Sequence, residues 1–212
     1  MYVWFDGRSG YISWSTEWAE RENKNWEDYW KKPDTKLIHF IGKDNIVFHC
    51  IIFPSILKAH GEFILPEDVP ANEFLNLEGK KISTSNNWAI WLDEYLKDFK
   101  NMQDSLRYSL ASILPEQNDS EISEDEMIRR NNEELVAAWG NLVQRVFSQY
   151  INNFDDLDTT FEYEKIDVNL MEGAKNCFIT TGEMIEKVEL KSSLQNVMAY
   201  VNSINAYLNE TE

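Results

Sequence analysis

The sequence predicts an α/β region followed by an all-α region. Three observations support this: short β-rich runs alternate with helical patterns up to about residue 112, helical periodicity dominates after about residue 115, and the charge changes at the same place. Residues 1–112 hold 17 acids and 13 bases, a balance of −4, whereas residues 113–212 hold 20 acids and 7 bases, a balance of −13. Because the secondary-structure pattern and the charge change at the same place, the sequence indicates two regions of different architecture.

Composition excludes several classes of protein. With 212 residues, 43% hydrophobic and 13% aromatic, the chain is long and apolar enough to bury a core. No apolar run reaches the roughly 18 residues that span a bilayer, so no membrane is expected. Cys50 and Cys177 form no CxxC pair, which argues against a metal site in this chain and favours a reducing cytoplasm. The strong acidity argues against nonspecific nucleic-acid binding, so an RNA contact requires a local basic or polar stripe.

The first region reads as strands and helices in alternation. "MYVWF" predicts a strand, and "SWSTEWAERE" and "WEDYW" predict helical segments. "TKLIHFI" predicts a buried strand, followed by a helix over "KDNIVFHCIIF" that Pro54 kinks before "SILKAHG". "DVPANEFLNLEG" predicts a further strand that leads into a turn. Strand–helix–strand order implies a parallel sheet with crossover helices.

The second region begins after a polar linker, "LPEQNDSEISEDE". Its "SEDE" predicts a helix start with Ser123 as the cap and Glu126 three residues on. Further apolar residues recur at helical spacing: Leu135, Trp139, Leu142, Val143, Val146, Phe147 and Tyr150. Two more long helices are predicted, over about 166–187 and 189–209.

The predicted first strand poses a problem, because a strand of a parallel sheet needs neighbours on both sides. A half sheet alone exposes edges and apolar faces. We therefore expect this chain to associate with another segment or to be cut from a longer protein, and the second interpretation is favoured.

Two polar stretches are candidates for nucleotide binding. In "KKISTS", Lys80 or Lys81 could counter the charge of phosphates, although a solvated hairpin tip has the same composition. In "HFIGKDNIVFHC", a strand runs into Gly42 and a helix begins near Asp44, where a doubly wound sheet binds its ligand. His49 could face the same crevice. The alternative is an Asp that caps a helix and a His that belongs to the core.

Two further stretches are candidates for other ligands. "YVWFDGRSGY" places Trp4, Asp6 and Tyr11 at the end of the predicted first strand, where aromatic rings could wall a small apolar pocket. Core aromatics beside a turn are the alternative. "RRNNEELVAAWGNLVQR" places Asn141 and Arg145 four apart on one helix face, a pair suited to the base edges of unstacked RNA. An ordinary polar helix face is the alternative there.

Taken together, these stretches resemble methionyl-tRNA synthetases, a family of class I aminoacyl-tRNA synthetases. The resemblance covers nearly the whole chain and is closest in "KLIHFIGKDNIVFHCIIFPSILKAHG", "ILPEDVPANEFLNLEGKKISTS" and "NWAIWLDEYL". "KISTS" at 81–85 is similar to the family's mobile KMSKS-type signature. The resemblance implies the second half of a Rossmann-type nucleotide-binding fold with the KMSKS-type loop, followed by an anticodon-binding helix bundle. The implied domains are 1–72 for the Rossmann-type part, 73–115 for the loop and stem-contact region, and 116–212 for the helical part.

The resemblance also implies a ligase activity and its partners. Methionine would be activated by ATP, with Mg²⁺ as the usual counterion, and then transferred to tRNA(Met). The implied methionine pocket is lined by Trp4, Tyr11, Phe48, His49 and Phe53. The implied ATP contacts are Gly42, Asp44 and Lys81. The implied catalytic residues belong to the loop that closes over the triphosphate: Lys81, Ser83, Thr84 and Ser85. The implied anticodon readers are Asn141 and Arg145. Both transfers depend on positioning and charge stabilisation, so no nucleophilic side chain is needed.

The chain departs from the family in four places. No HIGH-type motif occurs, and the family's zinc-bearing insertion is missing, so we expect the chain alone to be unable to form the adenylate. The sequence stops before the family's Pro-Trp dipeptide, whose tryptophan stacks on the anticodon. Gly7-Arg8-Ser9 replaces Ala-Pro-Ile beside the implied methionine pocket. Thr84 replaces the second lysine of KMSKS, so Lys80 or Lys81 would have to share its role.

Two other functions fit parts of this pattern. A non-catalytic tRNA-binding module would lack the nucleotide-binding half naturally. A class I synthetase for another amino acid would explain Gly7-Arg8-Ser9, but Trp4, Tyr11 and the long match around "FHCIIFP" count against it.

Overall fold

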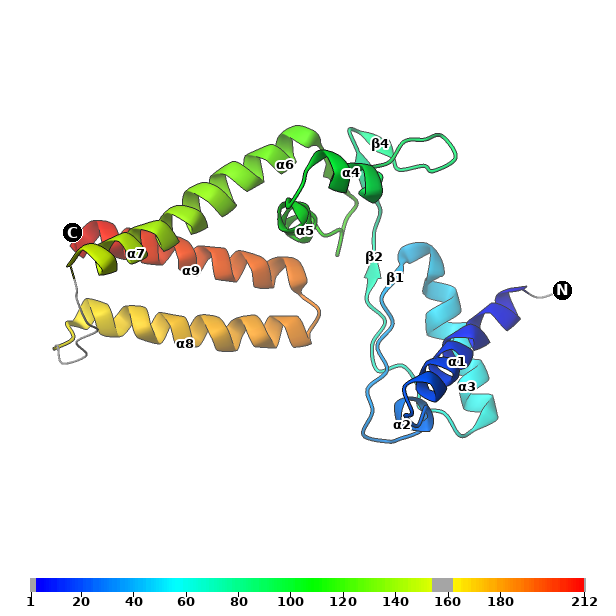
Figure 1. The fold of residues 1–212 in the computed structure, drawn as a ribbon. Helices are drawn as coiled ribbons and strands as arrows, with labels where there is room; N and C mark the ends of the chain where they lie inside the picture. Colours follow the sequence, from blue (N-terminus) through cyan, green and yellow to red (C-terminus); the bar gives the residue numbers. More distant parts are fainter. Residues whose placement is uncertain (1–2, 154–161, 212) are drawn as a thin grey trace. The chain divides into compact units, whose positions relative to one another are not determined.

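The structure is a computed structural model that describes residues 3–153 and 162–211. The chain forms two compact units, residues 1–74 and residues 75–212. Each unit has its own helices, strands and buried side chains, and each is described by itself. Figure 1 labels the elements in chain order.

The first unit opens with α1 (Val3–Arg21), so the predicted strand over "MYVWF" is wrong. In the part of the chain that the structure describes, no strand pairs with this segment. A helix instead satisfies its own backbone donors and acceptors. Hydroxyls of Ser15 and Thr16 donate to the carbonyls four residues earlier, at 2.8 and 2.9 Å. The prediction of helix over "SWSTEWAERE" is confirmed.

A short parallel pair of strands follows α2 (Glu27–Trp30). β1 (Ile41–Gly42) pairs with β2 (Ala71–Asn72) in the register Ile41↔Ala71 and Gly42↔Asn72. The predicted parallel pairing is confirmed. The predicted buried strand "TKLIHFI" is only partly right, because Phe40 is 61% exposed and His39 is buried. Its side chains thus alternate between solvent and core, as in a strand with one covered face.

The helix predicted after β1 is present but changes its winding twice. It begins as a 3-10 turn, η1 (Lys43–Asn45), becomes a π-helix, η2 (Phe48–Ile52), and continues as α3 (Phe53–His60). Pro54 has no N–H, and its ring would collide with the carbonyl four residues earlier in a regular helix. The wider π turn directly before Pro54 relieves that collision. Gly61 ends α3 with a left-handed φ of 88°.

The core of the first unit is aromatic. Trp30, Phe53 and Leu57 are buried and contact one another, and Phe53 is only 1% exposed. The partly buried residues packed against them are Tyr11, Ile12, Trp26, Leu37 and Phe63. Helices α1, α2 and α3 therefore share one small core.

The second unit begins with a three-stranded sheet of order β4-β3-β5. β3 (Leu75–Leu77) pairs antiparallel with β4 (Lys80–Lys81) and parallel with β5 (Ser120–Ile122). β5 was not predicted, because its residues lie in the predicted linker. Glu78 and Gly79 make the β3–β4 turn with φ of 49° and 74°, so the turn predicted at the end of "EFLNLEG" is present.

A second core lies against this sheet. Leu77, Ile113 and Ile122 are buried together, and Trp88 and Met127 pack against them. The segments between β4 and β5 form α4 (Leu92–Asp98) and α5 (Gln103–Ser112). Residues far apart in the chain thus meet around β3.

One long helical segment follows, as predicted. It consists of α6 (Glu124–Arg130), the π-helix η3 (Asn131–Gly140) and α7 (Asn141–Asn153). Ser123 caps its start, because its Oγ accepts from the backbone N–H of Glu126 at 3.2 Å. The predicted Ser123 cap is confirmed. The wide π turns in the middle were not predicted.

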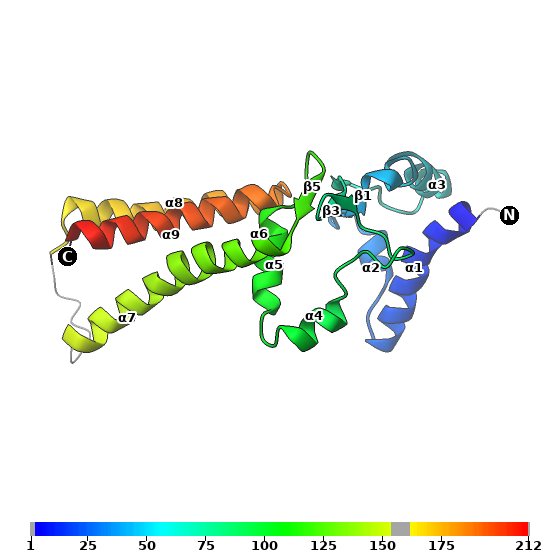
Figure 2. The same ribbon diagram turned by 90° about the horizontal axis from the view of Figure 1, so that it is seen from above.

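The last two helices also agree with prediction. α8 (Lys165–Glu186) and α9 (Leu190–Thr211) lie side by side in opposite directions, which both ribbon views show (Figures 1 and 2). Tyr200 of α9 donates its hydroxyl to the carbonyl of Leu170 in α8 at 2.9 Å. The predicted ranges 166–187 and 189–209 match these helices within two residues.

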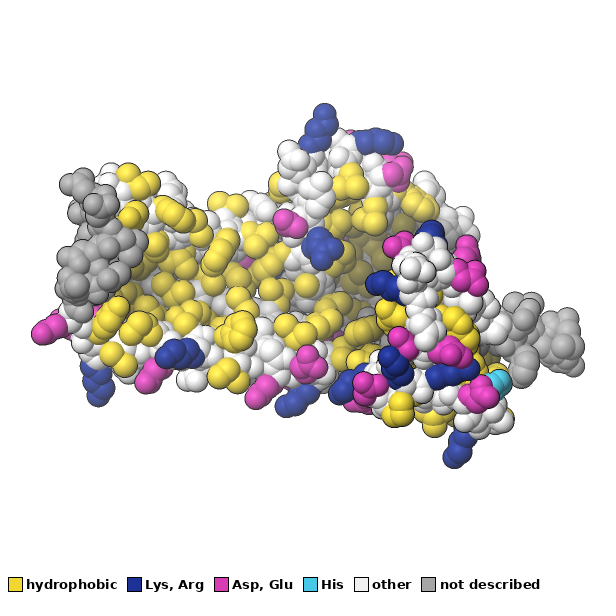
Figure 3. All heavy atoms as spheres, turned by 60° about the horizontal axis from the view of Figure 1, so that its bottom comes forward, with side chains coloured by type: hydrophobic (Ala, Val, Ile, Leu, Met, Phe, Trp, Pro, Cys, Tyr) yellow, Lys and Arg dark blue, Asp and Glu magenta, His cyan; other side chains and the backbone are white. Residues whose placement is uncertain are grey.

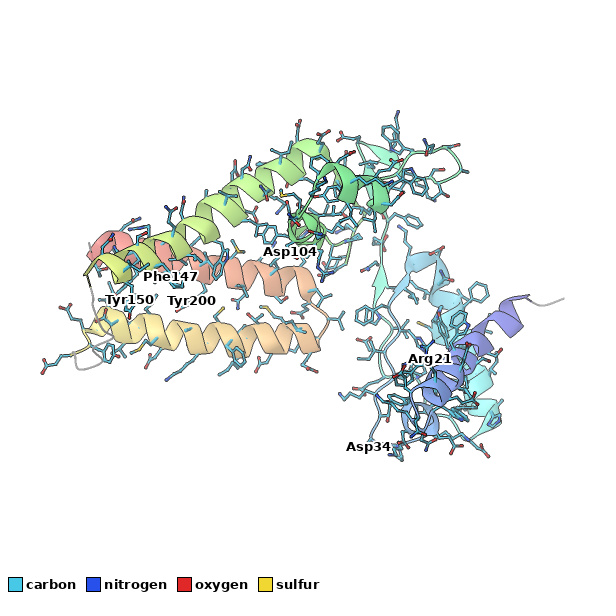
Figure 4. The ribbon with its side chains drawn as sticks, viewed as in Figure 1. Arg21, Asp34, Asp104, Phe147, Tyr150 and Tyr200 are labelled. Atoms are coloured by element: carbon cyan, nitrogen blue, oxygen red, sulfur yellow. The ribbon has the colours of Figure 1, made fainter. Side chains whose placement is uncertain are left out.

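The helical segments expose many large apolar side chains. Figure 3 shows hydrophobic side chains gathered on one face of the helical part. Figure 4 marks Phe147 and Tyr150 on α7 and Tyr200 on α9. Of the apolar positions predicted from periodicity, Leu142 is buried, whereas Phe147 is 61% exposed. Helical periodicity therefore predicted the helix correctly but not the burial of its apolar face.

Candidate functional site

The carboxyl end of β1 presents a glycine and a carboxylate. Gly42 is extended, with φ −86° and ψ 153°, and the first helical turn begins at the next residue. A Cβ at position 42 would lie 2.9 Å from the Asp44 carboxylate, so glycine leaves that space to the carboxylate. Asp44 is exposed. The structure therefore brings Gly42 and Asp44 together at a strand end, where open α/β sheets place their ligands.

A neighbouring ion pair ties the two parallel strands together at this end. The Lys43 ammonium forms a salt bridge with the Glu73 carboxylate, and it lies 4.3 Å from the centre of the Phe74 ring. Both partners of the salt bridge are about one-third exposed. Glu73 was not predicted, because only the β1–β2 register places it beside Lys43.

Tyr11 and His49 form a hydrogen-bonded pair between α1 and the π-helix. The Tyr11 hydroxyl lies 3.0 Å from His49 Nε2, and His49 Nδ1 lies 3.0 Å from the carbonyl of Asn45. A carbonyl only accepts, so in the neutral imidazole Nδ1 carries the proton and Nε2 accepts from Tyr11. His49 is 1% exposed. Both nitrogens of a fully buried ring thus have partners, which fixes the ring orientation.

Aromatic rings surround this pair. The centre of the Tyr11 ring lies 5.9 Å from that of His49 and 6.0 Å from that of Phe53. The buried His39 ring, which sequence analysis did not single out, lies 5.3 Å from His49. Phe48 is half-buried. Trp4 belongs to α1, but its side chain lies outside the described part of the structure.

The loop at 81–88 is a small hairpin in the second unit. Ser83 and Trp88 exchange two backbone hydrogen bonds of 2.9 Å. They close a tight turn over residues 84–87, in which the Asn87 N–H donates to the Thr84 carbonyl at 3.1 Å and Asn87 has a φ of 51°. The Ser83 and Ser85 hydroxyls lie 3.1 Å apart, and Thr84 and Ser85 are exposed. The structure therefore places hydroxyls at an exposed tip next to Lys81.

The predicted RNA-reading pair lies on the first turns of α7. Asn141 is exposed, and Arg145 is half-buried. Arg145 Nη1 donates to Asn209 Oδ1 at 3.0 Å, which links α7 to the end of α9. One turn earlier in α9, Asn205 donates to the carbonyl of Ala138 at 3.1 Å. Sequence analysis missed both α9 asparagines; their spacing of four residues on one helix face was the only available signal.

Two further arginines of this region are paired with acids. Arg129 donates to Glu126 and Glu133 at 2.8 Å, and Arg130 lies 2.7 Å from Glu126. Hydrogen bonding from Arg129, with the nearby arginine charges, lowers the pKa of Glu126, while burial opposes the shift. Hydrogen bonds to Glu126 and Glu133 raise the pKa of Arg129 further. Their charges are therefore compensated locally by the neighbouring carboxylates.

Tyr108 belongs to the same cluster. Its hydroxyl donates to the Glu134 carboxylate, which also accepts from Arg130. Burial, followed by the Glu134 interaction, raises the pKa of the Tyr108 hydroxyl. A cavity of about 400 Å³ lies beside this cluster, lined by residues of α5, η3 and α9.

Within the described ranges, 3–153 and 162–211, no cluster of three His, Cys, Asp or Glu side chains could hold a metal ion. The helices in those ranges also lack an apolar stretch long enough to cross a membrane.

The candidate residues thus fall into four groups, two in each unit. Gly42 and Asp44 meet at the β1 end, and Tyr11 and His49 meet in the aromatic core of the same unit. The residues at 81–85 form the hairpin tip, and Asn141 and Arg145 share a helix face of the second unit.

Comparison with known proteins places this geometry in context. The sequence profile of the family described as "tRNA synthetases class I (M)" matches residues 1–147. The methionine–tRNA ligase of Christiangramia forsetii is 50% identical over 215 residues, which cover 100% of this chain and 31% of that protein. The methionine–tRNA ligase of Flavobacterium johnsoniae is 49% identical, with 100% and 30% covered. This chain therefore spans about a third of the length of these relatives.

Solved structures agree in fold. A methionyl-tRNA synthetase of Mycobacterium tuberculosis, bound by methionyl-adenylate, superposes with a TM-score of 0.74 at 23% identity. The match covers 84% of this chain and 34% of that one. The ligand-free form of the same enzyme superposes with a TM-score of 0.69. At such identity the likeness is one of fold.

Proposed function

Because this chain belongs to the class I tRNA synthetase family of the methionine type, we propose that it forms part of an ATP-dependent methionine–tRNA ligase. The proposed reaction activates methionine as the adenylate and transfers it to tRNA(Met). In this proposal, residues up to about 72 are the second half of the Rossmann-type domain, residues 73–115 are the loop and stem-contact region, and residues 116–212 read the anticodon. The observation that carries the proposal is the hydrogen-bonded Tyr11–His49 pair next to the Gly42–Asp44 strand end, within one unit.

The first unit offers a site for methionine and the nucleoside part of ATP. A thioether binds well against aromatic rings, and Tyr11, His49 and Phe53 supply them. The Asp44 carboxylate can accept hydrogen bonds from ribose hydroxyls, and Gly42 allows the close approach of a sugar or base. Mg²⁺ reaches such sites bound to the phosphates of ATP and usually retains several waters, so a dedicated cluster of protein ligands is not required.

The hairpin at 81–85 supplies charge and hydroxyls for the triphosphate. The reaction begins when the methionine carboxylate attacks the α-phosphorus and pyrophosphate leaves. Negative charge then builds up on the leaving oxygens, and the Lys81 ammonium with the Ser83, Thr84 and Ser85 hydroxyls can stabilise it. An exposed hairpin tip, closed at its base by the Ser83–Trp88 pair, suits a loop that closes over its ligand only during this step.

The second unit offers an RNA contact despite its acidity. Asn141 and Arg145 present an amide and a guanidinium four residues apart on one face of α7, and Asn209 orients the guanidinium. Such groups match the hydrogen-bonding edges of unstacked bases. The proposed contact is assigned to Arg145 because it shares this face of α7 with Asn141.

A chimera tests the catalytic part of this proposal. This chain would replace the matching 215 residues of the Christiangramia forsetii ligase, which it resembles at 50% identity. We expect the chimera to catalyse methionine-dependent exchange of pyrophosphate into ATP, and the 212-residue chain alone to be inactive because it has no HIGH-type motif. A folded but inactive chimera would favour the second candidate, a non-catalytic tRNA-binding module.

Titration with tRNA tests the anticodon-reading part. We expect the chain to bind tRNA with the anticodon CAU more tightly than the same tRNA with the first anticodon base changed, at one fixed moderate salt concentration. Arg145→Glu should weaken binding about tenfold or more. The matched control, Lys187→Glu at the end of α8, should have little effect. Equal losses in the two variants would remove Arg145 from the contact.

A further inference from the structure

Two adjacent lysines stand at the base of the 81–85 loop, and their strand pairing separates them. β4 consists of Lys80 and Lys81 only, with the register Leu77↔Lys80 and Asn76↔Lys81. Directly paired side chains share a face of the sheet, and successive side chains point to opposite faces. Leu77 belongs to the buried core cluster. Lys80 therefore stands on the core side of the hairpin, and Lys81 stands on the other side with Asn76.

On the core side, Lys80 lies against an anchored tryptophan. Its ammonium lies 4.9 Å from the centre of the Trp88 ring. The Trp88 indole N–H donates to the Leu77 carbonyl at 3.0 Å, and its ring packs against the core cluster. Trp88 also closes the hairpin through its backbone pair with Ser83. Trp88 thus contacts β3 and β4 through its indole ring and Ser83 through its backbone.

We propose that Lys80 is a positioning residue, which holds β4 against Trp88 so that Lys81 stands on the ligand-facing side of the hairpin. Lys80 then does not take over the role of the second KMSKS lysine, whose position Thr84 occupies. Lys81 is the residue whose ammonium contacts the phosphates on that side. The assignment of a triphosphate to Lys81 rests on the proposed function, whereas the contact between Lys80 and Trp88 does not.

Cation–π geometry makes this role chemically specific. An ammonium over an indole face is attracted by the ring quadrupole, and an arginine guanidinium can stack there equally well. A methionine at position 80 keeps the length of the side chain but loses the charge. We call the contact between the residue 80 side chain and the Trp88 ring the clamp. Lys80→Arg should therefore preserve the clamp, and Lys80→Met should weaken it.

A double-mutant cycle in the chimeric ligase separates a positioning role from direct phosphate contact. Lys80→Met should lower kcat of pyrophosphate exchange about two- to fivefold with little change in the KM for ATP, and Lys80→Arg should restore it. Lys81→Met should cost more than tenfold. In a Trp88→Leu background, Lys80→Met should add almost nothing, because its partner is already gone. An undiminished effect of Lys80→Met in that background would overturn the proposal and make Lys80 a phosphate ligand.

A readout that needs no activity keeps the two proposals apart. In the 212-residue chain, hydrogen exchange of the Trp88 indole N–H reports on its bond to Leu77. Lys80→Met should speed this exchange about two- to fivefold, whereas Lys81→Met and Lys80→Arg should not. Unchanged exchange in Lys80→Met would refute the clamp whatever the enzyme does. Faster exchange together with an inactive chimera would retain the clamp and reject the proposed function.

Discussion

The two units differ in how they use apolar and polar side chains. In the first unit, polar groups are taken into the core: His49 is fully buried among aromatic rings, with Tyr11 and a carbonyl as partners. In the second unit, charged groups pair on helix surfaces, as in the Arg129–Glu126 cluster, and large apolar side chains such as Phe178 remain 83% exposed. Binding of a small apolar substrate suits the first arrangement, and contact with another large molecule suits the second.

The largest difference should appear when phenylalanines are truncated in the two units. Phe53→Ala should cost about 3–5 kcal/mol of unfolding free energy, because it empties the aromatic core. Phe178→Ala on α8 should change it by less than about 0.5 kcal/mol. Urea denaturation followed by near-ultraviolet circular dichroism measures both. A cost above about 1 kcal/mol for Phe178→Ala would mean that its face is covered in solution, and the contrast between the units would fail.

A smaller effect should follow from removing one hydroxyl. Tyr11→Phe leaves His49 Nε2 buried without its donor, so we expect a loss of about 1–3 kcal/mol. Tyr29→Phe, at a partly exposed ring of the same unit, is the matched control and should be nearly neutral. The same denaturation measurement applies. Equal values for the two variants would show that the Tyr11–His49 bond adds nothing to the first unit.

The second unit should respond to the loss of its helix cap. Ser123→Ala removes the acceptor for the Glu126 N–H and should cost about 1 kcal/mol. Ser148→Ala, at an exposed position within α7, should be neutral or slightly stabilising, since alanine favours a helix. Amide hydrogen exchange of Glu126 measures the local effect. Unaltered exchange in Ser123→Ala would place the start of the helix under the control of tertiary contacts.

The smallest effect concerns pH. The folded pKa of Glu126 is lowered by Arg129, so its contribution to stability is present above the unfolded value of about 4.5 and is lost as the pH falls through the folded pKa. Glu126→Gln should therefore lower stability at pH 7 by less than about 1 kcal/mol and flatten the decline between pH 5 and pH 3. Thermal unfolding against pH tests this, with Glu172→Gln on α8 as the control. Parallel curves for Glu126→Gln and the unmodified chain would contradict it.

The accuracy of prediction differs between helices and strands. The bounds of α8 and α9 were predicted within about two residues, because helical hydrogen bonds are local. The helices α4 and α5 of the same unit were not predicted. Strands depend on distant partners. "MYVWF" has strand-like side chains, yet it forms the start of α1, and β5 lies within an apparent linker.

The sequence pattern and the family resemblance predict some contacts of the candidate residues and not others. Gly42 and Asp44 adjoin along the chain, so their meeting at a strand end could be expected from sequence. Three other contacts could not be expected from sequence, because only strand register and helix packing create them. They join Lys43 to Glu73, Lys80 to Trp88, and Arg145 to Asn209.

By itself, the sequence determined the long helices after residue 123, the Ser123 cap, the turn at Gly79 and the family. These depend on neighbouring residues or on long consecutive matches. The tertiary structure alone decided which side chains are buried, the tautomer of His49, and the opposite faces of Lys80 and Lys81. The physical reason is that burial, register and hydrogen-bond partners are relations between distant segments, which exist only after the chain has paid the entropy of bringing them together.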